Sequence, residues 1–394
     1  MSEQYPGGFI TKTTPTVSTS SAQGMWTLSQ QAGYQKQGLW PIPPVITVGA
    51  SATYKASAQL QFTCVCTLST TASVIVYVDY TNDGIYAVVA TRSGTTLTYG
   101  TPVLVRSGFS PQNATCAALS ATTVVVCYET TASNHLGTKV LTISGTSISV
   151  GAEATNGAVT QYPSVVPLTS TTALCAYSVG AVVITVSGTT ASYGTGVNFT
   201  GSSNGTIQLS SISSTKAILA RINGSNSNYP TVNVVTVSGT TVTMGANYVV
   251  EAISGSTSSP WIGIAATSAS GAISTWKTAS GDLPKAVAMT ISGTAVTFGA
   301  VQNLGSVALE GSANQSMAPV SATQAIFVYS VQSTGYLGAY VLTSSGTTLT
   351  ASLPTETLAL NAGRASVAQM SGNIFLNPYR VGTSYGAAQV LTVV

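Results

Sequence analysis

The tripeptide Ser-Gly-Thr occurs six times in this chain of 394 residues, each time between two short runs of β-branched and apolar residues. Val, Ile, Thr and Tyr favour the pleated, half-buried surface of a strand. A glycine at the first central position is what a two-residue type II′ turn requires. The repeat therefore predicts six antiparallel hairpins, with turns at Ser93–Thr95, Ser144–Thr146, Ser187–Thr189, Ser238–Thr240, Ser292–Thr294 and Ser345–Thr347.

A seventh hairpin is split between the two ends of the chain. The final segment Ala387–Val394 (AAQVLTVV) matches the run VNVVTV that precedes Ser238. The segment Val45–Ala50 (VITVGA) matches Thr241–Ala246 (TVTMGA), which follows the same turn. We therefore expect these two segments to pair with each other and to close a ring, which hides the sheet edges that an open array would expose.

A second landmark gives the same count of seven. A ten-residue block, Leu-Ser-x-Thr-x followed by three apolar residues, any residue and Tyr, recurs with some variation at intervals between 44 residues (Tyr177 to Arg221) and 55 residues (Arg221 to Trp276). Each unit has room for four strands; in the third these are expected at 164–168, 173–177, 181–187 and 190–193. A fixed period of this size with four strands is typical of a propeller. We predict an all-β chain with a seven-bladed β-propeller at residues 45–394, preceded by an extended N-terminal arm at residues 1–44 that contains a short helix.

The composition argues against several classes of protein. Charged residues make up only 5% of the chain, and the formal charge of +3 includes no basic run, so no nucleic-acid partner is expected. Apolar residues are divided among short strands, which argues against membrane insertion. The polar start (MSEQYPGG) lacks a secretory apolar region and favours a protein that is retained or assembled in the cytoplasm. The five cysteines lie in apolar runs and are expected to be small buried side chains, with no cofactor.

The arm has a different character from the repeats. It carries a Thr/Ser/Pro tract and two of the four tryptophans. Thr27 and Gln30 have capping-box spacing, so a short helix is expected to run to about Gln37 and to stop at Gly38. An arm of 44 residues forms little core alone and is expected to dock on something larger. The candidate attachment residues are Phe9, Trp26, Leu28, Tyr34 and Trp40.

The residues of the arm carry a family resemblance. The segment GGFITKTTPTVSTSSAQGMWTLSQQAGYQKQGLWP resembles the N-terminal segment of virion structural proteins of tailed bacteriophages, in which a Gly-Gly start precedes W-T-L-x-Q-Q and a closing G-x-W-P. The propeller units resemble S-G-T-T-x-T-x-G repeats of phage and bacterial proteins. The resemblance implies a non-enzymatic virion protein of the head or tail, either a fibre or a capsid decoration. Its arm would bind other virion proteins (capsid, connector or tail) and its propeller would project outward.

The sequence offers little for catalysis or metal binding. His135 is the sole histidine, and no G-x-S-x-G elbow, Walker A loop or HExxH helix is present. We therefore expect no enzyme. The run Asp79–Gly84 resembles the first half of a calcium loop, with Asp79, Thr81 and Asp83 as weak candidate ligands. Position 90, where such a loop needs a glutamate, is Ala, so a structural turn is favoured.

One face of the propeller is a candidate for ligand binding. Loops between second and third strands share this face with loops between blades, and they carry aromatic residues among Asn, Ser and Gly. Tyrosine in such surroundings suits stacking on sugars or contact with a protein surface. The alternative function is therefore a lectin-like module that binds a receptor or a host-surface glycan, although the same rings could pack between blades. The candidate residues are Tyr86, Tyr229, Tyr336, Tyr385 and Trp261.

Overall fold

The protein is described by a computed structural model that covers residues 4–5, 8–9, 16–17, 22–23, 28–37, 44–108, 113–130, 135–159, 161–201, 203–252, 261–305, 308–309, 316–331, 335–357, 362–382 and 385–394. The chain divides into two compact units, Met1–Pro44 and Val45–Val394. The described residues of the first unit form two two-stranded sheets and one helix: β1 (Gln4–Tyr5), β2 (Gly8–Phe9), β3 (Thr16–Val17), β4 (Ala22–Gln23) and α1 (Leu28–Lys36). No helix in the described parts of the chain is long and apolar enough to cross a membrane.

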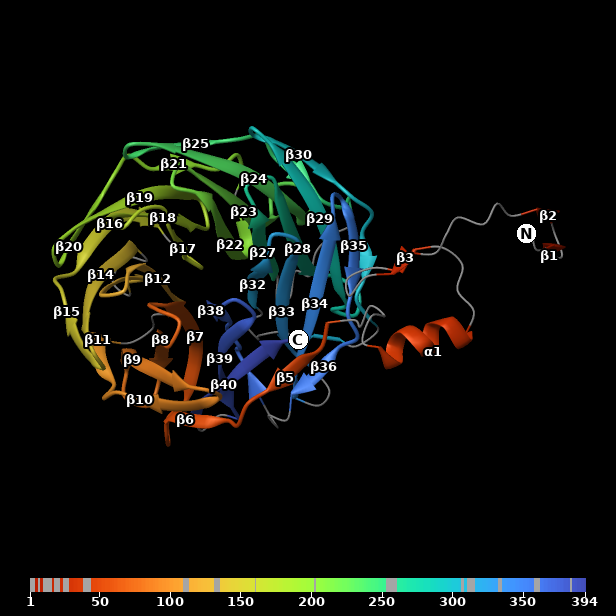
Figure 1. Ribbon diagram of the computed structural model, residues 1–394. Coiled ribbons are helices and arrows are strands. Elements are labelled where there is room, and N and C mark those ends of the chain that lie inside the picture. The colour runs from red at the N-terminus through yellow and green to blue at the C-terminus, as the bar shows by residue number, and fades with distance from the viewer. Residues whose placement is uncertain are drawn as a thin grey trace. The chain divides into compact units, whose positions relative to one another are not determined.

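The second unit is a seven-bladed β-propeller, as the repeats predicted (Figure 1). Seven antiparallel sheets are arranged around a central axis, and each runs from an inner strand at the axis to an outer strand at the rim. The inner strands are β7 (Leu60–Thr67), β12 (Ala114–Ser120), β17 (Ser164–Pro167), β22 (Ser203–Ser213), β27 (Ile262–Ser268), β32 (Ser316–Ser321) and β38 (Ala368–Ser371), with the short β37 (Ala362–Gly363) beside the last. The second strands are β8 (Ala72–Asp79), β13 (Thr123–Glu129), β18 (Thr172–Tyr177), β23 (Lys216–Asn223), β28 (Gly271–Lys277), β33 (Gln324–Ser330) and β39 (Ile374–Val381). The third strands are β9 (Gly84–Ser93), β14 (His135–Ser144), β19 (Gly180–Ser187), β24 (Tyr229–Ser238), β29 (Pro284–Ser292), β34 (Leu337–Ser345) and β40 (Tyr385–Val393).

The outer strand of every blade is broken into two pieces, which the sequence did not predict. Both pieces pair with the third strand of the same blade, one with its end and the other with its beginning. The first pieces are β10 (Thr96–Tyr99), β15 (Ser147–Val150), β20 (Thr190–Tyr193), β25 (Thr241–Met244), β30 (Ala295–Phe298), β35 (Thr348–Ala351) and β5 (Ile46–Val48). The second pieces are β11 (Val103–Ser107), β16 (Ala154–Val159), β21 (Val197–Asn198), β26 (Tyr248–Val249), β31 (Gln302–Asn303), β36 (Thr355–Thr357) and β6 (Ala52–Lys55). Blades are numbered 1 to 7 in the order of their inner strands.

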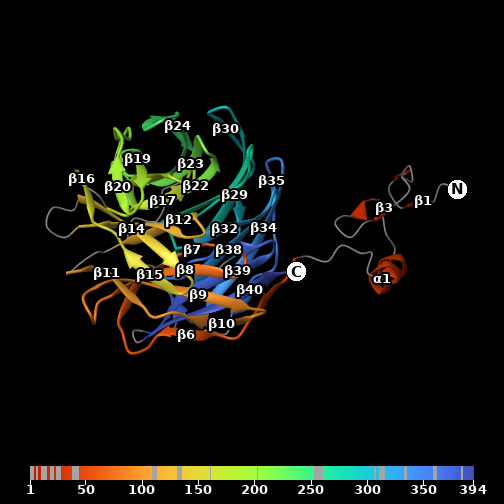
Figure 2. The same ribbon diagram turned by 60° about the vertical axis from the view of Figure 1, so that its left-hand side comes forward.

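Blade 7 joins the two ends of the propeller unit, as predicted. β40 pairs with β5 in the register Leu391–Val48, Thr392–Thr47 and Val393–Ile46. The backbones of Val45 and Val394 exchange two hydrogen bonds of 3.0 and 2.8 Å where the other blades have a Ser-Gly-Thr turn. Figure 1 shows β5, near the orange-red end of the colour range, beside the blue β40, and Figure 2 shows β40 in the view turned by 60°.

The six Ser-Gly-Thr turns have the geometry that the sequence predicted. Each turn glycine has a φ between +58° and +60°, and the threonine that follows is not among the residues with positive φ. A type II′ turn has positive φ at its first central residue only, whereas a type I′ turn has positive φ at both central residues. The six turns are therefore of type II′. Glycine occupies this position because it adopts positive φ without steric cost.

The hydrophobic core is divided among the seven seams between neighbouring blades. Seven clusters of buried apolar residues lie there, one in each seam. In β8, Val74 and Val76 face the seam with blade 2, whereas Ile75 and Tyr77 face the seam with blade 7. Because side chains alternate along a strand, a sheet that is buried on both faces needs a continuous apolar run. This explains why the second and third strands lack the polar and apolar alternation of a surface sheet.

The last residue of each ten-residue block packs into the seam with the preceding blade. Tyr77, Tyr128, Tyr177, Trp276, Tyr329 and Tyr379 are all buried there. In blade 4 the equivalent residue is Arg221, which is fully buried above the ring of Phe199. Its guanidinium donates to the carbonyls of Gly201 (2.9 Å) and Thr200 (3.0 Å), and to Asn247 Oδ1 (3.2 Å). Burial lowers the pKa of Arg221 to about 10, so it remains charged at neutral pH.

In blades 1, 2, 3 and 5 a close contact with the next blade explains the glycine that ends the S-G-T-T-x-T-x-G repeat. A Cβ built on Gly299 would lie 1.7 Å from the carbonyl oxygen of Thr347, the turn threonine of the next blade. At Gly100, Gly151 and Gly194 the corresponding distances are 2.3, 2.1 and 2.3 Å. Blade 6 has Ser352 at this position, and there the next blade has the paired chain ends in place of a turn. A side chain at this position is thus found in the blade that faces no turn threonine.

Replacing Gly299 by Ala should therefore destabilise the propeller. Its added methyl group forces the turn of Thr347 outward, and we expect a loss of about 1–3 kcal/mol in the free energy of unfolding, as for other overpacked sites. The matched control is Gly157→Ala in β16, where a Cβ would meet nothing within 4 Å and no loss is expected. Urea denaturation of both variants tests the contact, and equal stability of the two would contradict it.

Candidate functional site

The central axis of the propeller contains two cavities, one above the other. The first lies on the side of the loops that join the blades, has a volume of about 190 Å³, and is lined by residues of all seven blades. The second lies toward the turns between first and second strands and has a volume of about 290 Å³. The side chains that line both cavities, and so form the layer between them, are Val65, Cys116, Val165, Met317 and Val367.

Hydroxyl groups of the inner strands bridge neighbouring blades around this axis. Ser164 Oγ accepts a hydrogen bond from the backbone N–H of Leu209 in the next blade (3.0 Å). Ser316 Oγ accepts likewise from Val367 N–H (3.1 Å), and Thr67 Oγ1 donates to the carbonyl of Gln369 (2.7 Å). Serine and threonine can therefore line the channel without leaving the backbone groups of the inner strands unsatisfied.

The loop-side cavity is polar but carries no charge. Its lining includes the amides of Asn113 and Gln208 and the aromatic rings of Phe62, Tyr162 and Trp261. No Asp, Glu, Lys, Arg or His is among its described lining residues. Amides both donate and accept hydrogen bonds, and aromatic rings offer an apolar face. This combination suits a small neutral polar ligand, although the cavity is smaller than the roughly 300–1,000 Å³ typical of sites for drug-sized molecules.

Two of the five predicted ligand-face residues are packed inside the propeller. Trp261 is 3% exposed and stacks on Phe327 with 5.5 Å between ring centres. Tyr86 is half-buried and stacks on Tyr77 at 5.8 Å. Trp261 also lines the cavity at the axis, a placement that no local sequence pattern indicates because it depends on how the inner strands converge.

The other three predicted residues remain partly exposed but lie on separate blades. Tyr229 begins β24 in blade 4, Tyr336 precedes β34 in blade 6, and Tyr385 begins β40 in blade 7. Tyr385 is 37% exposed. The structure places these rings at equivalent points of different blades, and none of them lines either cavity at the axis.

The calcium-like segment forms a structural turn. Asp79 is fully buried, and its carboxylate accepts hydrogen bonds from the N–H groups of Thr81 (2.9 Å) and Asn82 (3.0 Å). It also accepts from Asn82 Nδ2 (2.7 Å) and pairs with Lys55 Nζ (3.3 Å). Thr81 Oγ1 accepts from Gln59 N–H, and Asp83 has a φ of 49°. Within the described residues, no group of three or more His, Cys, Asp or Glu is placed to hold a metal ion.

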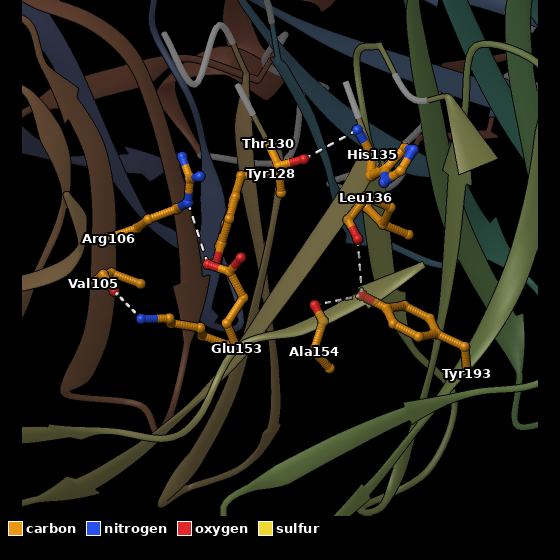
Figure 3. Close-up of polar contacts among 10 residues, drawn as sticks. Val105, Arg106, Tyr128, Thr130, His135, Leu136, Glu153, Ala154 and Tyr193 are labelled. Carbon is orange, nitrogen blue, oxygen red and sulfur yellow. Dashed lines mark hydrogen bonds and ion pairs between the residues drawn. The ribbon is translucent and has the colours of Figure 1, made fainter. Parts of the chain in front are cut away.

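A tyrosine, a carboxylate and a guanidinium meet where blades 1 and 2 touch near the rim (Figure 3). Tyr128 Oη donates to Glu153 Oε2 (2.7 Å), which also pairs with Arg106 Nε (3.2 Å). Arg106 lies above the Tyr128 ring at 5.4 Å. Burial, and next the hydrogen bond to Glu153, raises the pKa of Tyr128 well above its usual range. The phenol therefore stays protonated, and the cluster holds two blades together rather than supplying a nucleophile.

The same polar network continues into blade 3. Lys139 Nζ donates to the carbonyl of Val105 in blade 1 (2.9 Å). Tyr193 Oη of blade 3 contacts the carbonyls of Leu136 and Ala154 in blade 2, each at 3.2 Å (Figure 3). Beside this network, the backbone N–H of His135, the sole histidine, donates a hydrogen bond to Thr130 Oγ1 (3.1 Å).

The attachment residues predicted in the arm are only partly covered by the structure. Trp26 and Trp40 lie outside the described residues. Phe9 belongs to β2 and Leu28 begins α1. Tyr34 lies in α1 and is half-buried.

Comparison with known proteins identifies the fold but no family. No protein-family model matches the chain, and no curated protein matches it in sequence. Solved structures with the same fold include a protein of unknown function from Dyadobacter fermentans, with 12% identity, a TM-score of 0.53, and coverage of 89% of this chain and 99% of that one. A mutant of AofleA from Arthrobotrys oligospora has 9% identity, a TM-score of 0.50, and coverage of 81% and 94%.

One of these neighbours is an enzyme. The intramolecular trans-sialidase from Ruminococcus gnavus, solved in complex with oseltamivir carboxylate, has 8% identity, a TM-score of 0.50, and coverage of 86% of this chain and 96% of that one. At such identities the likeness concerns the fold alone. The structural neighbours are thus propellers of different kinds, and sialidases are among them.

Burial of Glu129 beside Tyr128 gives a prediction about pH. Glu129 is 7% exposed, and burial raises the pKa of its carboxyl above the usual 4.5. The folded protein then holds this proton more tightly than the unfolded chain does, so stability should fall as the pH rises from about 4.5 through the folded pKa. The variant Glu129→Gln should show a smaller fall over that range in urea denaturation at a series of pH values. An identical pH dependence in both proteins would refute the assignment.

Proposed function

We propose that this protein is a non-enzymatic structural component of a tailed-phage virion, in which the N-terminal arm binds another virion protein and the propeller is displayed outward. The observation that carries the proposal is that the chain divides into two compact units, of which the second closes on itself. The propeller closes with its own strands from Ile46 onward, whereas β1 pairs with β2 and β3 pairs with β4. Residues 1–44 form a compact unit of their own, and they carry the segment that resembles virion proteins.

The distribution of charge supports a role without catalysis. Four carboxylates are engaged in ion pairs with four different cations, at Asp79–Lys55, Glu153–Arg106, Asp282–Lys277 and Glu251–Lys285. The cavity at the axis has no Asp, Glu or His among its described lining residues. Acid–base catalysis needs a titratable group within hydrogen-bonding reach of the reacting atoms, and glycoside hydrolysis usually needs two carboxyl groups. These four ion pairs lie within or between blades and add to their cohesion.

Attachment through the arm predicts the effect of removing its two tryptophans. Buried aromatic residues dominate the binding energy of many interfaces, so the full-length double variant Trp26→Ala/Trp40→Ala should lose most of its occupancy in particles. Particles assembled from the genome that encodes this chain, with and without the change, would be purified and their protein content measured by mass spectrometry. Unchanged thermal melting of the variant is the folding control. Normal occupancy of the variant, or absence of the unaltered chain from particles, would refute the proposal.

A second candidate function, binding of a neutral glycan, is favoured by the loop-side cavity. Its amides and hydroxyls match the hydroxyl groups of an uncharged sugar, and its rings offer apolar faces. In this candidate function the sugar would bind at the axis of the propeller, away from Tyr229, Tyr336 and Tyr385 on their separate blades.

The glycan candidate predicts a loss of binding in Asn113→Ala/Gln208→Ala. Two lost hydrogen bonds of about 0.5–1.5 kcal/mol each should weaken binding of methyl glycosides of neutral hexoses by roughly tenfold or more, measured by titration calorimetry. The matched control Gln302→Ala/Asn303→Ala removes two exposed amides outside the cavity and should bind normally. Loss of binding in Tyr229→Ala/Tyr336→Ala/Tyr385→Ala alone would move the site to the exposed tyrosines, and no binding by the unaltered protein would eliminate this candidate.

A further inference from the structure

Three of the five cysteines meet at the seam between blades 1 and 2, beside the central axis. Cys64 and Cys66 are two residues apart in β7, so both side chains lie on the same face of that strand. Cys116 lies opposite on β12, and its sulfur is 3.3 Å from the sulfur of Cys64. This separation is a contact between two thiols rather than a bond, because a disulfide requires about 2.05 Å.

The channel gives access to this thiol pair. Cys64 and Cys116 both line the loop-side cavity, whereas Cys66 and Cys116 line the second cavity. Cys64 is half-buried, and Cys66 and Cys116 are 7% and 8% exposed. A small uncharged molecule that enters the neutral cavity would therefore reach Cys64, which is the most exposed of the three cysteines.

We infer that Cys64 and Cys116 form a thiol–disulfide exchange site, which accepts small neutral disulfides through the central channel and closes to a disulfide between blades 1 and 2. The two sulfur atoms need to approach by only about 1.3 Å, from 3.3 Å to the bonded distance. The inference does not depend on the proposed virion role.

The reaction proceeds in two balanced steps. The thiolate of Cys64 attacks one sulfur of the external disulfide, which releases one thiolate and leaves a mixed disulfide on Cys64. Cys116 then gives its proton to solvent and attacks the sulfur of Cys64, which releases the second thiolate. In sum, two cysteine thiols are oxidised by two electrons and one external disulfide is reduced to two thiols.

The order of attack follows from the surroundings of the two sulfurs. Hydrogen bonds with Cys64 and Cys66, and then burial, raise the pKa of the Cys116 thiol. A thiol with a raised pKa provides little thiolate near neutral pH, so Cys116 is the poorer first nucleophile. Once Cys64 carries the mixed disulfide, the proximity of Cys116 favours closure over a second external attack.

The remaining two cysteines provide an internal control. Cys127 and Cys175 contact each other across the seam between blades 2 and 3, where burial and then the hydrogen bond with Cys127 raise the pKa of Cys175. Both are fully buried, and neither lines the two cavities at the axis. This second pair of neighbouring thiols has no contact with the cavities through which a disulfide would enter. It should therefore stay reduced in the folded protein.

The experiment treats the reduced, folded full-length chain with 2-hydroxyethyl disulfide and follows the intact mass. We expect the final product to lack two hydrogen atoms relative to the reduced protein, peptide mapping to join Cys64 to Cys116, and Cys127 and Cys175 to remain alkylatable after unfolding. The oxidised protein should also melt a few degrees higher and revert with dithiothreitol, because the new bond constrains the unfolded chain.

Matched variants distinguish the pair Cys64 and Cys116 from the neighbouring Cys66. Cys66→Ser should still close, whereas Cys64→Ser should not. The inference is overturned by a mixed disulfide that never closes, by equal oxidation of Cys127 and Cys175 in the folded protein, or by closure through Cys66 in Cys64→Ser. The peptide map of the unaltered chain decides the assignment even where a variant fails to fold.

Discussion

Burial of both faces of every sheet is the constraint on which this structure depends. The second and third strands carry apolar side chains toward two seams at once, so a blade needs a neighbour on each side. Only a closed ring provides this for all seven blades, and β40 closes it by pairing with β5. The core is therefore a set of seven thin layers, and losing any seam would expose apolar surface on two blades.

A chain with so few charges holds its blades together largely by neutral contacts. Serine and threonine hydroxyls bridge the inner strands, tyrosine hydroxyls reach across seams near the rim, and the glycines before the breaks in the outer strands let the turns of the next blade approach closely. The four ion pairs also lie within or between blades, so they add to cohesion rather than forming a charged surface site. The central cavity consequently has a polar but uncharged lining, which links the composition of the chain to the ligands that it suits.

The chain divides into two compact units, and the proposed function assigns attachment to the first and display to the second. The propeller unit closes on its own strands, β40 and β5. The fold does not by itself select a function, since propellers of the same shape include an intramolecular trans-sialidase. The features on which the proposals for this chain rest are therefore the arm, the cavity at the axis and the cysteines beside that cavity.

Much of the fold could be read from local patterns in the sequence. The six turns, the seven blocks and the matching chain ends fixed the number of blades and the pairing of β40 with β5, because turn chemistry and strand alternation are properties of neighbouring residues. The strands of the third unit were predicted to within one residue of their observed bounds. Tertiary structure alone decided which side chains meet across seams, because residues that touch there lie tens to hundreds of positions apart. It broke each outer strand into two pieces, placed Trp261 beside the cavity at the axis, and brought Cys64 to Cys116.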